Sequence, residues 1–133
     1  MDDAALAAIV KMVPFAAHLD LTIVELGRDR VVVHALIKPE YCTSGGTAHG
    51  GFLMALADFT GAVGAFQVLP EGAKGTTTIE SKTNMVGAAP AGSTLVATAT
   101  PVHVGRRTSV WTTRVESADG KLISLTTQTQ MAL

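Results

Sequence analysis

A chain of 133 residues has room for one domain with one core, so a single domain over residues 1–133 is expected. Hydrophobic residues make up 47% of it and charged residues 16%, which excludes a disordered chain, and the mean hydropathy of +0.35 suggests that subunit contacts cover apolar surface. The net charge of −1 and the few aromatic residues argue against nucleic-acid binding, and the single cysteine excludes an intrachain disulfide or a cysteine-rich zinc site.

The first third of the chain predicts one short helix followed by two strands. Asp2 or Asp3 can cap the helix, and Pro14 is expected to end it. β-branched residues then predict an antiparallel strand pair, which a polar, glycine-bearing loop follows. These elements are expected over residues 4–10, 21–26, 30–37 and 41–48.

The segment 50–69 predicts a buried helix, because apolar side chains cover nearly every face of it. Pro70 stops this helix. The segment is long enough to cross a bilayer, but Asp58 interrupts its middle, and the acidic N-terminus lacks the basic start of a signal peptide. We therefore expect a cytoplasmic protein without a membrane partner.

Four further strands are expected to fill the rest of the chain, since Thr, Val and Ile dominate it. Asp119-Gly120 between the last two is a strong hairpin signal. These strands are predicted over residues 76–85, 93–104, 108–117 and 121–131. The whole order predicts an α+β domain in which an antiparallel sheet of roughly six strands encloses a long central helix.

Asp58 is the strongest candidate for a chemical role, because it is the only charge between Glu40 and Glu71. A carboxylate in an apolar helix is costly to bury unless it is paired or used. At the start of the same helix, Gly50 and Gly51 would present free N–H groups to a ligand, which suits an oxyanion hole. The simpler alternatives are an acid that points to water or pairs with a distant Arg or Lys, and a loop-to-helix turn that needs glycine.

The spacing between these two features predicts a site shared by two subunits. Gly50 and Asp58 are eight residues apart, so they lie about 12 Å from each other along one helix. One reacting carbonyl cannot contact both groups over that distance. Two such helices running antiparallel in a two-fold dimer would bring Gly50 of one subunit opposite Asp58 of the other.

The segment 46–58, Gly-Thr-Ala-His-Gly-Gly-Phe-Leu-Met-Ala-Leu-Ala-Asp, resembles the signature of the PaaI-type branch of the hotdog-fold thioesterases. That branch includes phenylacetate-pathway thioesterases and relatives of 4-hydroxybenzoyl-CoA thioesterase. Segments 78–84 and 105–108 also resemble the family, so the similarity covers most of the chain. The resemblance implies a hotdog fold, hydrolysis of an acyl-CoA to free acid and CoA without metal or cofactor, and a homodimer that can pair into a tetramer.

The resemblance also implies roles for single residues. Asp58 would be the catalytic carboxylate, as general base or as nucleophile, and the Gly50 N–H would polarise the thioester carbonyl. His49 would hold the loop or contact the thioester, and Thr76 would position water. Thr43 stands where relatives often carry Asn or Gln, so a shorter side chain would have to take over the work of that amide.

Substrate binding is expected to need an apolar acyl pocket and cations for the CoA phosphates. The pocket is expected to include Met54, Phe59 and Phe66. Arginine suits bidentate phosphate contacts, although charges at strand ends are often simply solvated. The residues assigned to substrate binding are Gly51, Phe52, Lys82, Arg106 and Arg107.

Two other functions remain open at this point. A hotdog hydratase or dehydratase acting on acyl thioesters would need a catalytic His beside the acid, and only His49 is near the helix. A non-catalytic module that binds acyl-CoA would keep its affinity after loss of Asp58. The four His residues are scattered and no carboxylates cluster, which argues against a metal site.

Overall fold

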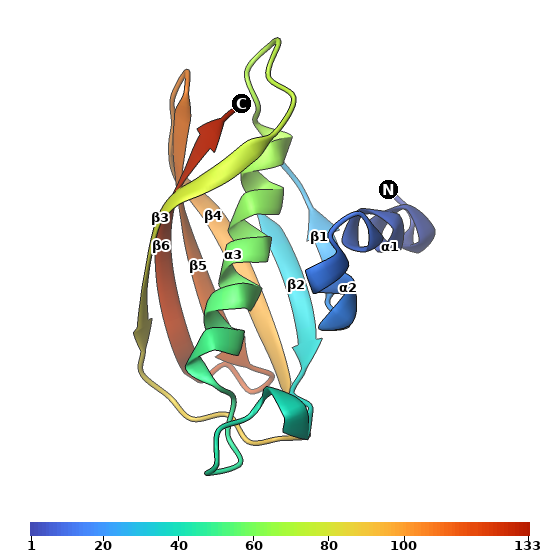
Figure 1. Cartoon of the computed structure of the whole chain (residues 1–133), viewed down its shortest axis with the longest axis vertical. Helices are drawn as coiled ribbons and strands as arrows, with labels where there is room; N and C mark the ends of the chain where they lie inside the picture. Colours follow the sequence, from blue (N-terminus) through green and yellow to red (C-terminus); the bar gives the residue numbers. More distant parts are fainter.

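The computed structural model describes residues 1–133 and consists of a six-stranded antiparallel sheet with one long helix, α3, packed against one face (Figure 1). Two short helices lie beside the β1 edge of the sheet (Figure 1). The arrangement confirms the predicted α+β hotdog fold. Its elements are α1 (Asp3–Lys11), α2 (Pro14–His18), β1 (Thr22–Leu26), β2 (Val31–Leu36), a 3₁₀ turn (Pro39–Tyr41), α3 (Gly50–Gln67), β3 (Thr76–Met85), β4 (Thr94–Val104), β5 (Thr108–Ser117) and β6 (Leu122–Ala132).

The predicted elements agree with the structure to within one or two residues at each end, except near Pro14. Pro14 was expected to end the helical segment, but it begins α2 as its first helical residue. Proline is well suited to that position, because its fixed φ is helical and the missing N–H would have had no intrahelical partner. Two short N-terminal helices therefore replace the single one predicted.

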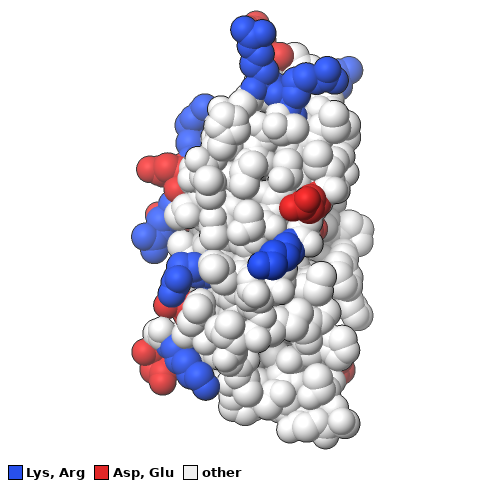
Figure 2. Space-filling model, turned by 90° about the vertical axis from the view of Figure 1, so that its left-hand side faces the viewer, with Lys and Arg blue, Asp and Glu red and all other residues white.

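The strand order in the sheet is β1-β2-β4-β5-β6-β3, so β1 and β3 form the two open edges. The connection from β2 to β3 passes through α3, which carries the chain across one face of the sheet (Figure 1). The strand at the far edge, β3, has only Glu80 and Lys82 as charged residues, and this side of the molecule is largely uncharged (Figure 2). An edge strand with so few charges is a ready template for pairing with another chain.

The layer between α3 and the sheet is apolar on one side and polar on the other. Strands β1, β2 and β4 supply most of the sheet residues in the core cluster, whereas β6 supplies only Ile123 and β3 none. The residues of β6 that alternate onto the helix side are all polar and fully buried. These are Ser124, Thr126, Gln128 and Gln130. In this polar half, the Ser124 Oγ and Gln128 Oε1 atoms lack a hydrogen-bond partner, as does Thr113 Oγ1 on β5.

Glycines allow α3 to lie close to the sheet. The ring of Trp111 packs onto Gly64, where a Cβ would lie 2.6 Å from its Cζ3 atom. One turn earlier, the amide of Gln128 fills the space where Gly61 would carry a Cβ. Substitution at either glycine therefore requires a buried side chain from the sheet to move.

The helix α3 is not buried on all sides as the sequence predicted, because one stripe of it is open in the single chain. Met54 and Phe66 are exposed and Asp58 is half-buried. These positions share one helical face with Gly51 and Ala62, as their spacing of three or four residues requires. Apart from Asp58 the stripe has no charge, so it is a surface suited to contact with another helix. No helix of the structure is long and apolar enough to cross a membrane.

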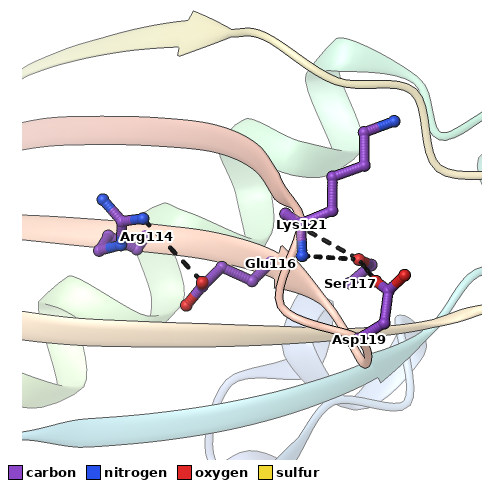
Figure 3. Close-up of polar contacts among 5 residues, drawn as sticks. All are labelled: Arg114, Glu116, Ser117, Asp119 and Lys121. Atoms are coloured by element: carbon purple, nitrogen blue, oxygen red, sulfur yellow. Dashed lines mark hydrogen bonds and ion pairs between the residues drawn. The ribbon is translucent and has the colours of Figure 1, made fainter.

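The hairpin between β5 and β6 turns at the predicted Asp119-Gly120 pair (Figure 3). Gly120 has φ +89°, a conformation that favours glycine. The Ser117 hydroxyl donates to the Asp119 carboxylate, and it accepts a hydrogen bond from the Lys121 N–H at 3.2 Å. The Ser117 hydrogen bond lowers the pKa of the Asp119 carboxyl. Local side-chain contacts therefore fix the register of this hairpin.

Candidate active site

His49 is the N-cap residue of α3. Its Nδ1 atom accepts a hydrogen bond from the Gly51 N–H at 2.8 Å, and its own N–H donates to the Tyr41 carbonyl at 2.8 Å. The side chain therefore caps one of the N–H groups that a helix leaves unpaired at its start. His49 therefore joins the loop to the start of the helix, and the Gly51 N–H is occupied by this cap.

Gly50 keeps a free N–H at the start of the helix. It is the first helical residue, and its N–H makes no hydrogen bond within the chain. The Met85 side chain covers its Cα, since a Cβ at this position would lie 2.6 Å from the Met85 Sδ atom. A helix N-terminus combines a free donor with partial positive charge, which is the requirement for binding a developing oxyanion.

Asp58 lies two turns further along α3 and faces β3 and β6. Its Oδ1 atom accepts a hydrogen bond of 2.6 Å from the Thr78 hydroxyl of β3. The Gln128 amide of β6 lies 3.4 Å from the same oxygen and 3.3 Å from the Asp58 backbone carbonyl. The three ion pairs of the protein lie elsewhere, so neutral side chains hold this carboxylate. Oδ2 has no hydrogen-bond partner in the subunit.

Thr76, the predicted water-positioning residue, does not contact Asp58. Its hydroxyl donates to Gln130 Oε1 at 3.0 Å, and the Gln130 amide donates in turn to the Thr78 hydroxyl. Two side chains, Gln130 and Thr78, therefore lie between Thr76 and Asp58, and Thr78 is the direct hydrogen-bond partner of the acid. The sequence reasoning missed Thr78 and both glutamines, although Gln128 and Gln130 alternate along a predicted strand.

Two other predicted residues lie away from the acid. Thr43 sits in the exposed loop before α3, where its hydroxyl donates to the Thr47 carbonyl at 3.4 Å and accepts from the Gly45 N–H at 3.3 Å. Phe52 is a core residue that stacks on Tyr41 with ring centroids 4.8 Å apart. Of the apolar pocket predicted on α3, only Met54 and Phe66 are open to solvent, because Phe59 is also in the core.

The predicted phosphate-binding cations fall into two separate groups. Arg106 and Arg107 are exposed at the turn between β4 and β5, whereas the Lys82 ammonium lies on β3 and donates to Asn84 at 3.0 Å. The sheet register places Lys82 two strands away from β5 and several residues further along from the arginine turn, which corresponds to roughly 15–20 Å. One phosphate cannot bind both groups in the same subunit.

One large groove lies away from Asp58, which does not line it. It encloses about 610 Å³ between the two short helices and the edge strand β1. Asp20 at its rim is paired with Lys38, and the hydrogen bond from that ammonium lowers the pKa of the Asp20 carboxyl. The groove has two acids among its lining residues, Asp3 and Asp20, and no group of three or more metal-ligating side chains occurs anywhere in the chain.

Comparison with known proteins matches residues 45–124 to the family model described as thioesterase superfamily. A protein of Archaeoglobus fulgidus, provisionally named an esterase, is 30% identical over 107 residues, which cover 80% of this chain and 67% of that protein. A mutant of the phenylacetic acid degradation protein PaaI of Thermus thermophilus is 32% identical, with a TM-score of 0.82 over 90% of this chain and 99% of that one.

A likeness in fold alone extends to a Streptococcus mutans protein whose structure is bound to acetyl CoA. It is 22% identical, with a TM-score of 0.78 over 85% of this chain and 88% of that one.

Proposed function

This chain belongs to the thioesterase superfamily, and on that premise we propose that it hydrolyses an acyl-CoA thioester to the free acid and CoA. The acetyl CoA bound to the Streptococcus mutans protein supports CoA as the carrier of the acyl group. The reaction needs only a base or nucleophile, a water molecule and an oxyanion donor, so we propose that it proceeds without metal or redox cofactor.

One observation carries the proposal: an acid with one anchored and one free oxygen lies on the open stripe of α3. Thr78 and Gln128 approach only Asp58 Oδ1, which leaves Oδ2 available to a water or a thioester carbon. A merely structural carboxylate would be expected to use both oxygens or to pair with a cation. Asp58 does neither.

We propose that the site is completed by a second copy of the chain. Within one helix, Gly50 and Asp58 are about 12 Å apart, too far to act on the same carbonyl. An antiparallel partner helix would place Gly50 opposite the partner's Asp58, with the two-fold axis passing near Met54. The apolar stripe of α3 and the sparsely charged edge of β3 are the surfaces that such a dimer would cover.

In the proposed reaction, the Gly50 N–H of one subunit binds the thioester oxygen and the Asp58 carboxylate of the other acts from the opposite side. As general base, Asp58 Oδ2 takes a proton from water while the water oxygen attacks the carbonyl carbon. The tetrahedral oxyanion is stabilised by the Gly50 N–H, and its collapse releases CoA, which recovers the proton. As nucleophile, Oδ2 would instead attack the carbonyl carbon directly and expel the CoA thiolate, which leaves a mixed anhydride on Asp58. Water would then hydrolyse this anhydride to the free acid and the Asp58 carboxylate, and the CoA thiolate would take up the released proton.

The test is a hydrolysis screen over an acyl-CoA panel that includes short, medium-chain and aromatic acyl groups. We expect turnover of at least one of them, and a decrease of kcat by roughly two or more orders of magnitude in Asp58→Asn, which keeps the shape of the side chain. Tight acyl-CoA binding without hydrolysis, unchanged in Asp58→Asn, would identify a binding module instead. Addition of water to an enoyl-CoA would identify a hydratase.

A further inference from the structure

We propose that Thr78 and Gln130 are positioning residues, which hold Asp58 by one oxygen and thereby aim the other at the substrate. This inference rests on the proposed thioesterase function and adds a directed chain of hydrogen bonds to it. The chain runs from Thr76 through Gln130 and Thr78 to the Asp58 carboxylate, and it connects β3, β6 and α3.

The single proton of the Thr78 hydroxyl sets the direction of this chain. A carboxylate has no proton to give, so the 2.6 Å contact requires Thr78 to donate to Asp58 Oδ1. The hydroxyl oxygen can then only accept from Gln130, which must present its NH₂ group. The other end of the amide, Gln130 Oε1, accordingly accepts from the Thr76 hydroxyl at 3.0 Å.

Burial makes Gln130 an effective clamp for this direction. Only 1% of its surface is exposed, and both ends of its amide are hydrogen-bonded, so flipping the amide would place a carbonyl oxygen against Thr78. Thr78 would then have to choose between Gln130 and Asp58 as its acceptor. The observed orientation leaves Asp58 as the only acceptor for the Thr78 proton.

The strand register explains why Thr78 is the residue that reaches the acid. Thr78 is directly opposite Gln130 in the β3–β6 ladder, whereas Thr76 is opposite Ala132. A β-bulge between Thr78 and Glu80 follows, so the inner face is re-aimed immediately after Thr78. The Gln128 amide also lies 3.4 Å from Asp58 Oδ1, and together these contacts restrict rotation of the carboxylate.

The chain offers a matched control on the same strand. The Thr83 hydroxyl shares a 2.7 Å hydrogen bond with the Thr126 hydroxyl on the same inner face, but neither group contacts Asp58. Thr83→Val therefore removes a β3–β6 hydrogen bond of the same kind as Thr78→Val, with the same change of side-chain shape. A difference between the two variants reports on the acid and not on the strand pairing.

The experiment compares Thr78→Val, Thr78→Ser, Gln130→Met and Thr83→Val with the wild type in steady-state kinetics, thermal unfolding and crystal structures. We expect Thr78→Val to lower kcat by roughly 10–100-fold with KM changed less than about twofold, because a misdirected carboxylate affects the chemical step. Thr78→Ser should keep most of the wild-type kcat. The kcat of Gln130→Met should lie between those of Thr78→Val and Thr78→Ser, and the kcat of Thr83→Val should stay near that of the wild type. In the Thr78→Val crystal, the Asp58 carboxylate should leave its wild-type orientation.

Two results would overturn the inference: a kcat of Thr78→Val equal to that of Thr83→Val, or an Asp58 carboxylate that stays in place in the Thr78→Val crystal. Failure of the proposed function is distinct, since it would appear as a wild-type protein that hydrolyses no acyl-CoA. In that case the crystal structures still decide whether Thr78 fixes the carboxylate.

Discussion

Replacing Gly50 by proline should delete the oxyanion donor and leave the fold intact. Gly50 is the first helical residue, where proline is favoured and no intrahelical hydrogen bond is lost. His49 before it has φ −65° and ψ 140°, the extended conformation that a residue preceding proline adopts. The variant therefore removes one N–H from the site with little change to the helix.

The expected loss follows from the chemistry of this donor. Removing one oxyanion-hole donor lowers kcat by about 10²–10³-fold, or about 2.7–4 kcal/mol of transition-state stabilisation. Gly50→Ala is the matched control, because it adds a carbon against the Met85 Sδ atom but keeps the N–H. Met85 is nearly half exposed and flexible, so it can move aside in both variants. The ratio of the two kcat values isolates the N–H.

The assay is steady-state hydrolysis of the best acyl-CoA from the panel, with thermal unfolding to confirm that both variants fold. We expect Gly50→Ala to keep most of the wild-type kcat and Gly50→Pro to lose it, with KM changed much less. Equal kcat values for folded proline and alanine variants would refute the reasoning, whatever their level relative to wild type, because the N–H would then contribute nothing.

Three further predictions concern the assembly, the packing and the charges. Co-expressed Asp58→Asn and Gly50→Pro chains should recover about a quarter of wild-type activity. About half of randomly paired dimers would contain one chain of each kind, and one of the two sites in such a dimer would be intact. No recovery would contradict a site shared between two chains. Gly64→Ala should lower the unfolding free energy by up to about 2 kcal/mol, because overpacking against the buried Trp111 ring exceeds the gain in helix propensity. Gly75 has open space around it, so Gly75→Ala should leave the unfolding free energy unchanged in the same thermal unfolding experiment. Lys38 lowers the pKa of the Asp20 carboxyl. The stabilisation from this pair should therefore be complete above the usual aspartate pKa of about 4 and be lost as the pH falls below it. A difference in unfolding free energy between wild type and Asp20→Asn that stays constant across pH 2–6 in urea titrations would contradict this prediction.

The order of the elements could be predicted because each one has a strong local pattern. The β-branched runs, the breakers between them and the apolar segment of α3 agree with the structure closely. Asp58 was chosen as the candidate catalytic acid because it is the only charge in a long apolar segment, and that role stays a prediction. Pro14 was misjudged because proline both ends helices and begins them, and the two cases differ only in what the following residues do.

The partners of Asp58 could not be predicted in the same way, because they depend on strand register. Thr76 and Thr78 point to the same side of β3, and only the pairing with β6 decides which one meets the acid. One signal was present in the sequence: Gln128 and Gln130 alternate onto one face of a strand, and that face is buried. Buried glutamines indicate a polar partner nearby, and here that partner is the acid and its threonine.

The division of the helix–sheet layer into an apolar and a polar half has a consequence for how this protein can change. Thr113 and Ser124 bury hydroxyls that find no partner, so Thr113→Val and Ser124→Ala should make the protein more stable. Selection for stability alone would remove such groups. Under the proposed function, their presence in the half that holds Asp58 is what a conflict between activity and stability would produce. Laboratory evolution toward new acyl groups should therefore accumulate its substitutions along β6 and β3. The apolar packing of β1, β2 and β4 should keep the protein folded while those substitutions accumulate.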